Sequence, residues 1–150
     1  MKTDKWLKLH RTVRFGDTDA AGVMHFHQLL RWSHEAWEES LQSYGLDAAA
    51  VFPGTRNGQS MDIALPIVHC SAEFMAPLHV GDDLSITLDP TRLDPGSFEV
   101  RSRFTCQERA IATGCLRHVA IHTLTRRRTS LPEAIDRWLE ASNVGKLREL

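Results

Sequence analysis

The sequence predicts an α+β fold in which a mainly antiparallel β-sheet packs against one long α-helix. Residues 25–44 have helical periodicity, whereas four later stretches alternate apolar and polar residues and are separated by short polar reversals. Strands joined by such reversals form antiparallel sheets, and the long helix then covers one face. The 150 residues have the length of one domain, so we expect a single domain over residues 1–150.

The first half of the chain is predicted to be a strand, a turn and the long helix. Residues 6–15 alternate as in a half-buried strand, and residues 16–22 are rich in turn formers. Residues 25–44 form the amphipathic helix, which Gly45 ends in a left-handed cap. Residues 47–59 are expected to be irregular. The expected core positions are Leu7, Leu9, Val13 and Phe15 in the strand and Leu29, Leu30, Ala36, Trp37, Leu41 and Tyr44 in the helix.

The second half is predicted to be four strands and a short helix. Residues 94–97 form one tight reversal and residues 108–109 another. Ser130 and Glu133 have the spacing of a capping box, with Pro132 in the first turn of the helix that follows. The strands are expected at residues 66–74, 83–89, 98–104 and 111–124, the last being apolar on both faces as an interior strand is.

Composition and charge exclude several classes of protein. Hydrophobic residues make up 42% of the chain and charged residues 25%, which excludes wholesale disorder. The net charge of −1 gives no basic field for nucleic acid. No apolar run approaches the roughly 20 residues of a membrane helix, and the first five residues lack the apolar core of a secretion signal. Cys70, Cys106 and Cys115 form no CxxC pair, so we expect reduced thiols in a cytoplasmic protein.

One helix covers only one face of the predicted sheet. The other face would remain in contact with water unless a second copy of the chain covers it. We therefore expect a homo-oligomer, either a dimer or a tetramer.

The segment from Phe15 to Phe26 contains the densest group of candidate catalytic residues. Asp17 and Asp19 lie between a strand end and a helix start, where unpaired N–H groups stabilise an oxygen that becomes negative during acyl transfer. A carboxylate there can attack a carbonyl or deprotonate a water, and Gly22 allows close approach to the backbone. The spacing alone favours a simpler role, in which both aspartates only stabilise a turn and cap the helix.

Three segments resemble those of the 4-hydroxybenzoyl-CoA thioesterase family of hotdog-fold proteins. They are FGDTDAAG at residues 15–22, the helix with Arg31-Trp32, and PIVHCSAEF at residues 66–74. The resemblance extends over about residues 8–125 with matching element order. It implies a curved antiparallel sheet wrapped around the long helix, and subunits that dimerise through continuous sheets and often pair again into a tetramer.

The resemblance also implies which residues form the site. The family's catalytic carboxylate corresponds to Asp19, its carbonyl-polarising N–H corresponds to that of Phe26, and Asp17 is then structural. The DTDAAG form of the motif is most similar to members that hydrolyse 1,4-dihydroxy-2-naphthoyl-CoA in phylloquinone and menaquinone synthesis. We therefore expect hydrolysis of an aromatic acyl-CoA without a cofactor, with the pantetheine arm between subunits. Whether Asp19 attacks the carbonyl or activates water stays open.

The sequence departs from the family where relatives contact the substrate. His25-Phe26-His27 stands where relatives often have an aromatic or Pro-containing stretch, so His25 either contacts a substrate hydroxyl or only packs. Leu65 replaces a hydroxyl donor that some relatives have. A nucleotide-binding basic pair is absent around residues 94–96, which leaves Arg92 and the run that starts at Arg126 as candidates for the CoA phosphates, unless that run is a solvated edge.

Other sites find less support in the residues. His34-Glu35-Ala36-Trp37-Glu38 is not HExxH, and His118 and His122 have no third ligand at a suitable spacing, so we expect no metal. Glutamates on the long helix are alternative nucleophiles, but they fall opposite the apolar stripe, as on a solvated face. The cysteines have no assured base. The glutamates concerned are Glu35, Glu38 and Glu39.

Four other functions remain alternatives to aromatic acyl-CoA hydrolysis. The fold also suits a thioesterase for short or medium aliphatic acyl-CoA or acyl-carrier substrates, a non-catalytic acyl-CoA sensor, and a purely structural oligomer. A hotdog dehydratase is disfavoured, because the motif places an acid at Asp19 and no histidine lies within the loop itself.

Overall fold

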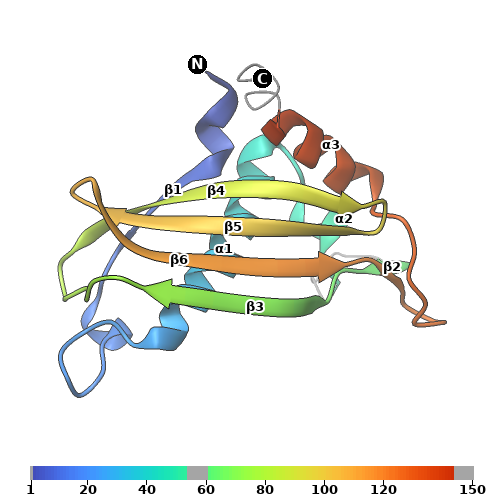
Figure 1. Ribbon diagram of the computed structural model, residues 1–150. Coiled ribbons are helices and arrows are strands. Elements are labelled where there is room, and N and C mark those ends of the chain that lie inside the picture. The colour runs from blue at the N-terminus through green and yellow to red at the C-terminus, as the bar shows by residue number, and fades with distance from the viewer. Residues whose placement is uncertain (1, 54–60, 144–150) are drawn as a thin grey trace.

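Five antiparallel strands in the order β1-β4-β5-β6-β3 form the main sheet (Figure 1). The computed structural model describes residues 2–53 and 61–143. A two-stranded ladder of β2 and β7 lies beside the main sheet, and its pairing is also antiparallel, as predicted. The strands are β1 (Lys8–Thr12), β2 (Ile63–Ala64), β3 (Ile67–Phe74), β4 (Asp83–Asp94), β5 (Ser97–Cys106), β6 (Arg109–Val119) and β7 (Ile121–His122).

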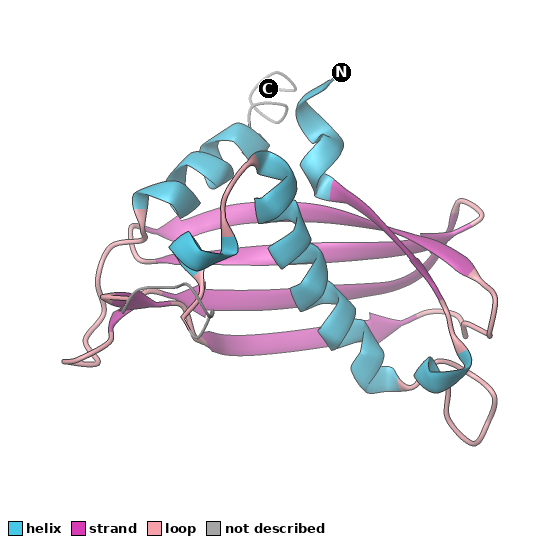
Figure 2. Cartoon of the chain, turned by 180° about the vertical axis from the view of Figure 1, so that it is seen from behind, coloured by secondary structure: helices cyan, strands magenta, loops and turns pink. Residues whose placement is uncertain are grey.

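The long helix α1 crosses one face of this sheet, and the opposite face is free of helices (Figures 1 and 2). This arrangement confirms the hotdog fold that the resemblance implies. No helix in the described part of the chain is long and apolar enough to cross a membrane. The helices are α1 (Phe26–Tyr44), α2 (Ala48–Val51) and α3 (Glu133–Asn143), with the 3-10 segments η1 (Lys2–Leu7) and η2 (Phe15–Asp17) on either side of β1.

Helix α1 begins and ends where its capping residues predict. His25 is the N-cap, with φ −65° and ψ 136°, and Gly45 closes the helix at φ +114°, a left-handed conformation that suits glycine. The buried stripe is shifted slightly from the predicted one, because Leu30 is half-exposed whereas Trp32 and Ser33 are buried. Leu29, Ala36, Trp37 and Leu41 are buried as predicted.

The core lies between α1 and the sheet, with α3 closing one side. Alternate residues of β4 are buried as the period-two pattern predicts, and β5 alternates in the same way from Val100 to Phe104, whereas its first four residues are all buried. Helix α3 packs on β4, and its Trp138 donates an indole N–H to Ser40 Oγ of α1 at 3.0 Å. The buried apolar residues of these elements include Leu84, Ile86, Leu88, Phe98, Val100, Phe104, Ile135, Trp138 and Leu139.

Several of the predicted boundaries are wrong, and β4 is among them because it continues to Asp94, past its predicted end at residue 89. The first strand is shorter than residues 6–15, since 3-10 turns occupy both ends and leave the Phe15 side chain 84% exposed. Residues 48–51 form the short helix α2 within the region predicted to be irregular, of which residues 54–60 lie outside the described residues. The strand predicted at residues 111–124 is interrupted, because the Ala120 N–H bonds to Gly96 O at the β4–β5 reversal.

The helix-free face of the sheet carries polar and charged side chains, and the expectation that a second copy covers it stays a prediction. Cross-strand neighbours there include Asp89 and Arg101. Glu99 accepts a hydrogen bond from Arg117 at 2.8 Å, and this bond lowers the pKa of Glu99. Exposed apolar side chains lie instead along β3 and directly after it. They are Ile67, Val68, Phe74 and Met75, each between 43% and 55% exposed.

Candidate active site

The loop between η2 and α1 presents Asp19 at the surface. Thr18 and Met24 form an antiparallel bridge across its neck, and the Asp19 N–H donates to Val23 O at 2.9 Å. Oδ1 of Asp19 accepts the Ala21 N–H at 2.8 Å, whereas Oδ2 has no partner among the described residues. One carboxylate oxygen therefore anchors the side chain, and the other is available for a ligand.

Asp17 has a different role, as the resemblance implies. Its Oδ2 accepts the Arg14 N–H at 2.8 Å, and its main-chain oxygen accepts the His25 N–H at 2.8 Å. The first bond closes the η2 turn and the second joins that turn to the start of α1. These contacts are structural, and they fix the position of the helix N-terminus relative to the Asp19 loop.

Gly22 supports the loop through its backbone conformation. Its φ is +79°, which an L side chain adopts only with strain, and a Cβ placed there would meet open space. No neighbouring protein atom in the described part of the chain therefore requires a glycine here, and the approach of a ligand to the backbone at this position stays a prediction. The left-handed φ is a second reason for glycine that the sequence did not reveal.

The start of α1 offers an unpaired donor. The Phe26 N–H has no hydrogen-bond partner among residues 2–53 and 61–143, and the first turn contains no acidic residue that would neutralise its positive end. The Phe26 side chain is 64% exposed, and the half-buried His25 ring stacks on it at 4.7 Å between centroids. Asp19, Gly22, His25 and Phe26 thus lie within one short loop and the helix start that follows it.

A shallow apolar hollow adjoins this loop. It has a volume of about 340 Å³ and lies between the end of the loop and the segment that follows β3. The Met24 N–H bonds to Leu78 O at 2.8 Å, which joins the two segments. The sequence analysis did not predict that the segment after β3 lines a hollow, although its apolar run is longer than a turn requires. The lining residues are Val23, Met24, Phe74, Met75, Ala76, Pro77 and Leu78.

The two candidate phosphate-binding arginines are not close to Asp19 in the same chain. Figure 1 shows the Asp19 loop at one end of the sheet and the β4–β5 reversal and the loop after β7 at the other. The 12 residues of β4 span roughly 35 Å between those ends. Arg92 binds Asp136 of α3 at 2.5 Å, whereas Arg126 is exposed with a left-handed φ of 63°.

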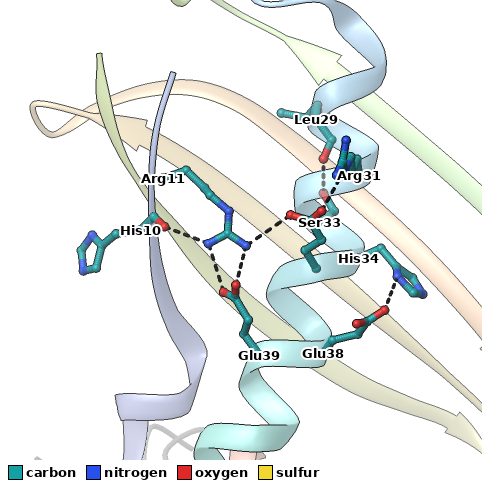
Figure 3. Close-up of polar contacts among 9 residues, drawn as sticks. His10, Arg11, Leu29, Arg31, Ser33, His34, Glu38 and Glu39 are labelled. Atoms are coloured by element: carbon teal, nitrogen blue, oxygen red, sulfur yellow. Dashed lines mark hydrogen bonds and ion pairs between the residues drawn. The ribbon is translucent and has the colours of Figure 1, made fainter. Parts of the chain in front are cut away.

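The three helix glutamates are all engaged in ion pairs. Arg11 of β1 makes a two-pronged ion pair with Glu39, at 2.8 and 3.0 Å, and also contacts Glu35, which binds Arg31 (Figure 3). Glu38 pairs with His34 at 3.0 Å. The prediction of a solvated helix face is therefore only partly correct, because the Glu35 and Glu39 carboxylates bind Arg11 of β1.

The remaining histidines and cysteines show no grouping for metal or thiol chemistry. Within the described ranges, no three His, Cys, Asp or Glu side chains are gathered as a metal site requires. His118 is fully buried and donates from Nδ1 to Leu65 O at 3.0 Å. All three cysteines are free thiols, and burial raises the pKa of Cys115.

Comparison with known sequences identifies relatives along the whole chain. The model of a family described as the thioesterase-like superfamily matches residues 13–139. A 1,4-dihydroxy-2-naphthoyl-CoA hydrolase from Synechococcus sp. strain WH7803 is 63% identical over 149 residues, which are 99% of this chain and 97% of that protein. The protein of the same name from Prochlorococcus marinus strain MIT 9313 is 58% identical over 148 residues, or 98% of each chain.

Solved structures agree with these relatives. A crystal structure from Prochlorococcus marinus strain MIT 9313 superimposes with a TM-score of 0.92 at 58% identity, and covers 95% of this chain and 99% of the other. The 1,4-dihydroxy-2-naphthoyl-CoA thioesterase Slr0204 from Synechocystis gives a TM-score of 0.78 at 32% identity, with 89% and 94% of the two chains covered.

Proposed function

Because the chain belongs to the thioesterase-like superfamily, we propose that it hydrolyses 1,4-dihydroxy-2-naphthoyl-CoA to 1,4-dihydroxy-2-naphthoate and CoA. The observation that carries the proposal is the Asp19 carboxylate, with one free oxygen, in the loop that leads to the unpaired Phe26 N–H. The relatives named for this substrate support the choice of acyl group. The reaction serves phylloquinone or menaquinone synthesis in the cytoplasm, where three free thiols stay reduced.

The chemistry needs few groups because a thiolate leaves readily. Asp19 Oδ2 either attacks the thioester carbonyl carbon or removes a proton from the attacking water. The carbonyl oxygen becomes negative in both cases, and the Phe26 N–H together with the positive end of α1 stabilises it. If Asp19 attacks, the C–S bond breaks to leave a mixed anhydride, and water then hydrolyses this anhydride to the free acid and the Asp19 carboxylate. If Asp19 activates water, the C–S bond of the tetrahedral intermediate breaks directly and releases the acid. In both cases the CoA thiolate takes up the proton that the water gives up and leaves as a thiol. Gly22 leaves room for the thioester above the loop.

A second copy of the chain completes the site in this proposal. Strand β3 is an edge strand of eight residues with exposed apolar side chains, which is a surface for pairing with another strand. Antiparallel pairing of two β3 strands about a two-fold axis sets the beginning of one against the end of the other. The apolar hollow at Phe74 is then closed by the first residues of the partner's strand.

The same pairing explains how distant arginines serve the site. The loop after β7 adjoins the beginning of β3, since β7 pairs with β2 just before that strand. The two-fold axis therefore moves the Arg126 loop of one subunit toward the Asp19 loop of the other. Arg126 is the better candidate for the CoA phosphates, because a phosphate at Arg92 would have to compete with Asp136. The pantetheine arm then lies between the subunits.

A panel of thioesters with free thiol as the readout tests the proposal. We expect 1,4-dihydroxy-2-naphthoyl-CoA to be cleaved with the highest kcat/KM, ahead of benzoyl-CoA, hexanoyl-CoA and an acyl-carrier thioester. Faster cleavage of the aliphatic thioesters would replace the proposal with an aliphatic thioesterase. Tight binding of the naphthoyl-CoA without release of thiol would indicate an acyl-CoA sensor. If the protein neither binds the naphthoyl-CoA nor releases thiol from any thioester, the Asp19 loop has only a structural role.

A further inference from the structure

The main-chain groups along the free edge of β3 restrict how another strand can pair with it. Strand β3 is the last strand of the main sheet, and its register with β6 is regular over residues 69–74 (Figure 1). Directly after the strand, the Met75 N–H bonds to Ile111 O at 2.8 Å. Because hydrogen bonding alternates along an antiparallel strand, the main-chain groups of residues 70, 72 and 74 point to the free edge.

A second copy of β3 can therefore pair with this edge in few registers. About a two-fold axis, the residues that point to the edge in one strand must lie opposite those that point to it in the other. Registers that meet this condition and overlap most of the strand have the axis at Cys70, Ser71 or Ala72. They differ in which side chains lie opposite one another.

The exposed apolar side chains at the two ends of β3 distinguish these registers. Ile67 and Val68 at its beginning are 43% and 55% exposed, and Phe74 and Met75 at its end are 50% and 54% exposed. An axis at Ser71 sets the first pair of one subunit opposite the second pair of the other, so that each covers the other. An axis one residue earlier or later leaves these pairs out of line.

The charged residue of β3 favours the same register. The exposed Glu73 side chain makes no ion pair or hydrogen bond within residues 2–53 and 61–143. With the axis at Ser71, its carboxylate lies opposite His69 of the partner subunit, whose ring N–H can donate to it. An axis one residue earlier would set Glu73 against Ile67, and an axis one residue later would make the two Glu73 carboxylates diagonal neighbours.

We propose that two copies of the chain pair along β3 about a two-fold axis at Ser71, and that Ile67 and Val68 of the partner subunit form the missing wall of the apolar hollow. Phe74 and Met75 line this hollow within one chain. In the proposed register they lie against these two residues of the partner subunit, so the acyl group contacts both subunits. The occupant of the hollow rests on the proposed function, whereas the register depends only on the pairing.

Single cysteines measure the register without a substrate. A residue on the axis lies opposite its own copy, with Cα atoms about 4.5 to 5.5 Å apart, which a disulfide can bridge. The native Cys70 reports an axis at residue 70, whereas Ser71→Cys and Ala72→Cys, each combined with Cys70→Ser, report axes at residues 71 and 72. Cys70→Ser alone gives the background from the two other cysteines.

We expect the Ser71→Cys variant to form a cross-linked dimer fastest in a mild oxidant, as measured by non-reducing electrophoresis. Faster cross-linking through residue 70 or residue 72 would overturn the proposed register. Cross-linking no faster than the background in all three proteins would overturn the pairing itself.

The charge across the interface is tested by Glu73→Gln. This variant is expected to raise the dissociation constant of the dimer about tenfold, because each interface loses two charge-assisted hydrogen bonds. Glu108→Gln is the matched control, since Glu108 is exposed and lies outside β3. Sedimentation velocity over a range of concentrations measures both, and equal dissociation constants would contradict the contact between Glu73 and His69.

The wall of the hollow is tested by Val68→Ala at a protein concentration at which sedimentation shows only dimer. Removing this apolar surface is expected to raise KM for 1,4-dihydroxy-2-naphthoyl-CoA about tenfold, whereas Val80→Ala should leave it unchanged. An unchanged KM in Val68→Ala would contradict the wall. If no thioester is cleaved although Ser71→Cys cross-links, the register stands and only the proposed function fails.

Discussion

At the scale of single residues, Asp17 and Asp19 differ in what occupies their carboxylates. The Asp17 side chain closes a turn, whereas one carboxylate oxygen of Asp19 has no partner in the described part of the chain. Two residues that a spacing argument treats alike thus have separate roles. The difference depends on hydrogen bonds to Arg14 and Ala21, which side-chain spacing along the sequence does not specify.

Replacing Asp19 with asparagine is expected to lower kcat about a thousandfold, because an amide neither attacks a thioester nor accepts a proton from water. The amide oxygen still accepts the Ala21 N–H, so the melting temperature and the affinity for CoA should stay near the parental values. Steady-state thiol release and thermal denaturation measure both. Asp17→Asn is the matched control and should retain the parental kcat. Parental turnover in Asp19→Asn would remove this residue from the mechanism.

His118 is expected to make the protein less stable in mild acid. Burial lowers its pKa from 6.5 to about 4, so the folded state keeps the ring neutral while the unfolded state takes up a proton. Stability is therefore complete above pH 6.5 and decreases as the pH falls toward 4, by roughly 2 to 3 kcal/mol. Urea unfolding at pH 7.5 and pH 4.5 should show a smaller difference in His118→Gln than in the exposed-site control His10→Gln. An equal difference in the two variants would exclude His118 as the cause.

At the scale of elements, the helix packs tightly against the sheet at a glycine. A Cβ on Gly114 of β6 would lie 2.8 Å from Ser33 Oγ of α1, whose hydroxyl donates to Leu29 O at 2.8 Å. Arg11 adds a second connection between sheet and helix through Glu39 (Figure 3). The position of α1 thus depends on one close contact near the middle of the sheet and one ion pair at its β1 edge.

Gly114→Ala is expected to lower the free energy of unfolding by about 1 to 2 kcal/mol, because the methyl group forces Ser33 to break its hydrogen bond or α1 to shift. Adding Ser33→Ala should recover part of this loss by making room. Gly16→Ala, where a Cβ meets nothing within 4 Å, is the control and should change stability little. Urea denaturation of the three variants is the measurement. A double variant no more stable than Gly114→Ala would contradict the contact as the cause.

At the scale of the whole molecule, the single chain has only part of the proposed site. The loop before α1, which contains Asp19 and borders the apolar hollow, lies at one end of the sheet, and the loop after β7, which contains Arg126, lies at the other (Figure 1). The exposed apolar edge β3 lies between them. A two-fold pairing through this edge brings the two ends together, so we expect activity to depend on self-association.

Val68→Lys is expected to weaken the pairing of β3 edges and to reduce kcat/KM together with the dimer population, because a charge at a closely packed edge must be desolvated. Val80→Lys is the matched control, since Val80 is 53% exposed and Val68 55%, but Val80 lies outside β3. Sedimentation velocity and thiol release at the same protein concentrations provide the comparison. A fully active monomer of Val68→Lys would show that one chain contains the whole site.

The sequence by itself determined the long helix and the main antiparallel strands, because periodicity, caps and turns are local properties, and its resemblance to a known family singled out residues 19–26 as the candidate site. Only the tertiary structure decided which of these elements pack against each other and which side chains they bring into contact. In the folded chain the last long strand is interrupted at Ala120 and the Phe15 side chain is exposed. Glu35 and Glu39 pair with Arg11, and the hollow after β3 adjoins the Asp19 loop. Such contacts join residues far apart in the chain, and their energies depend on which surfaces fold against each other, which no local pattern encodes.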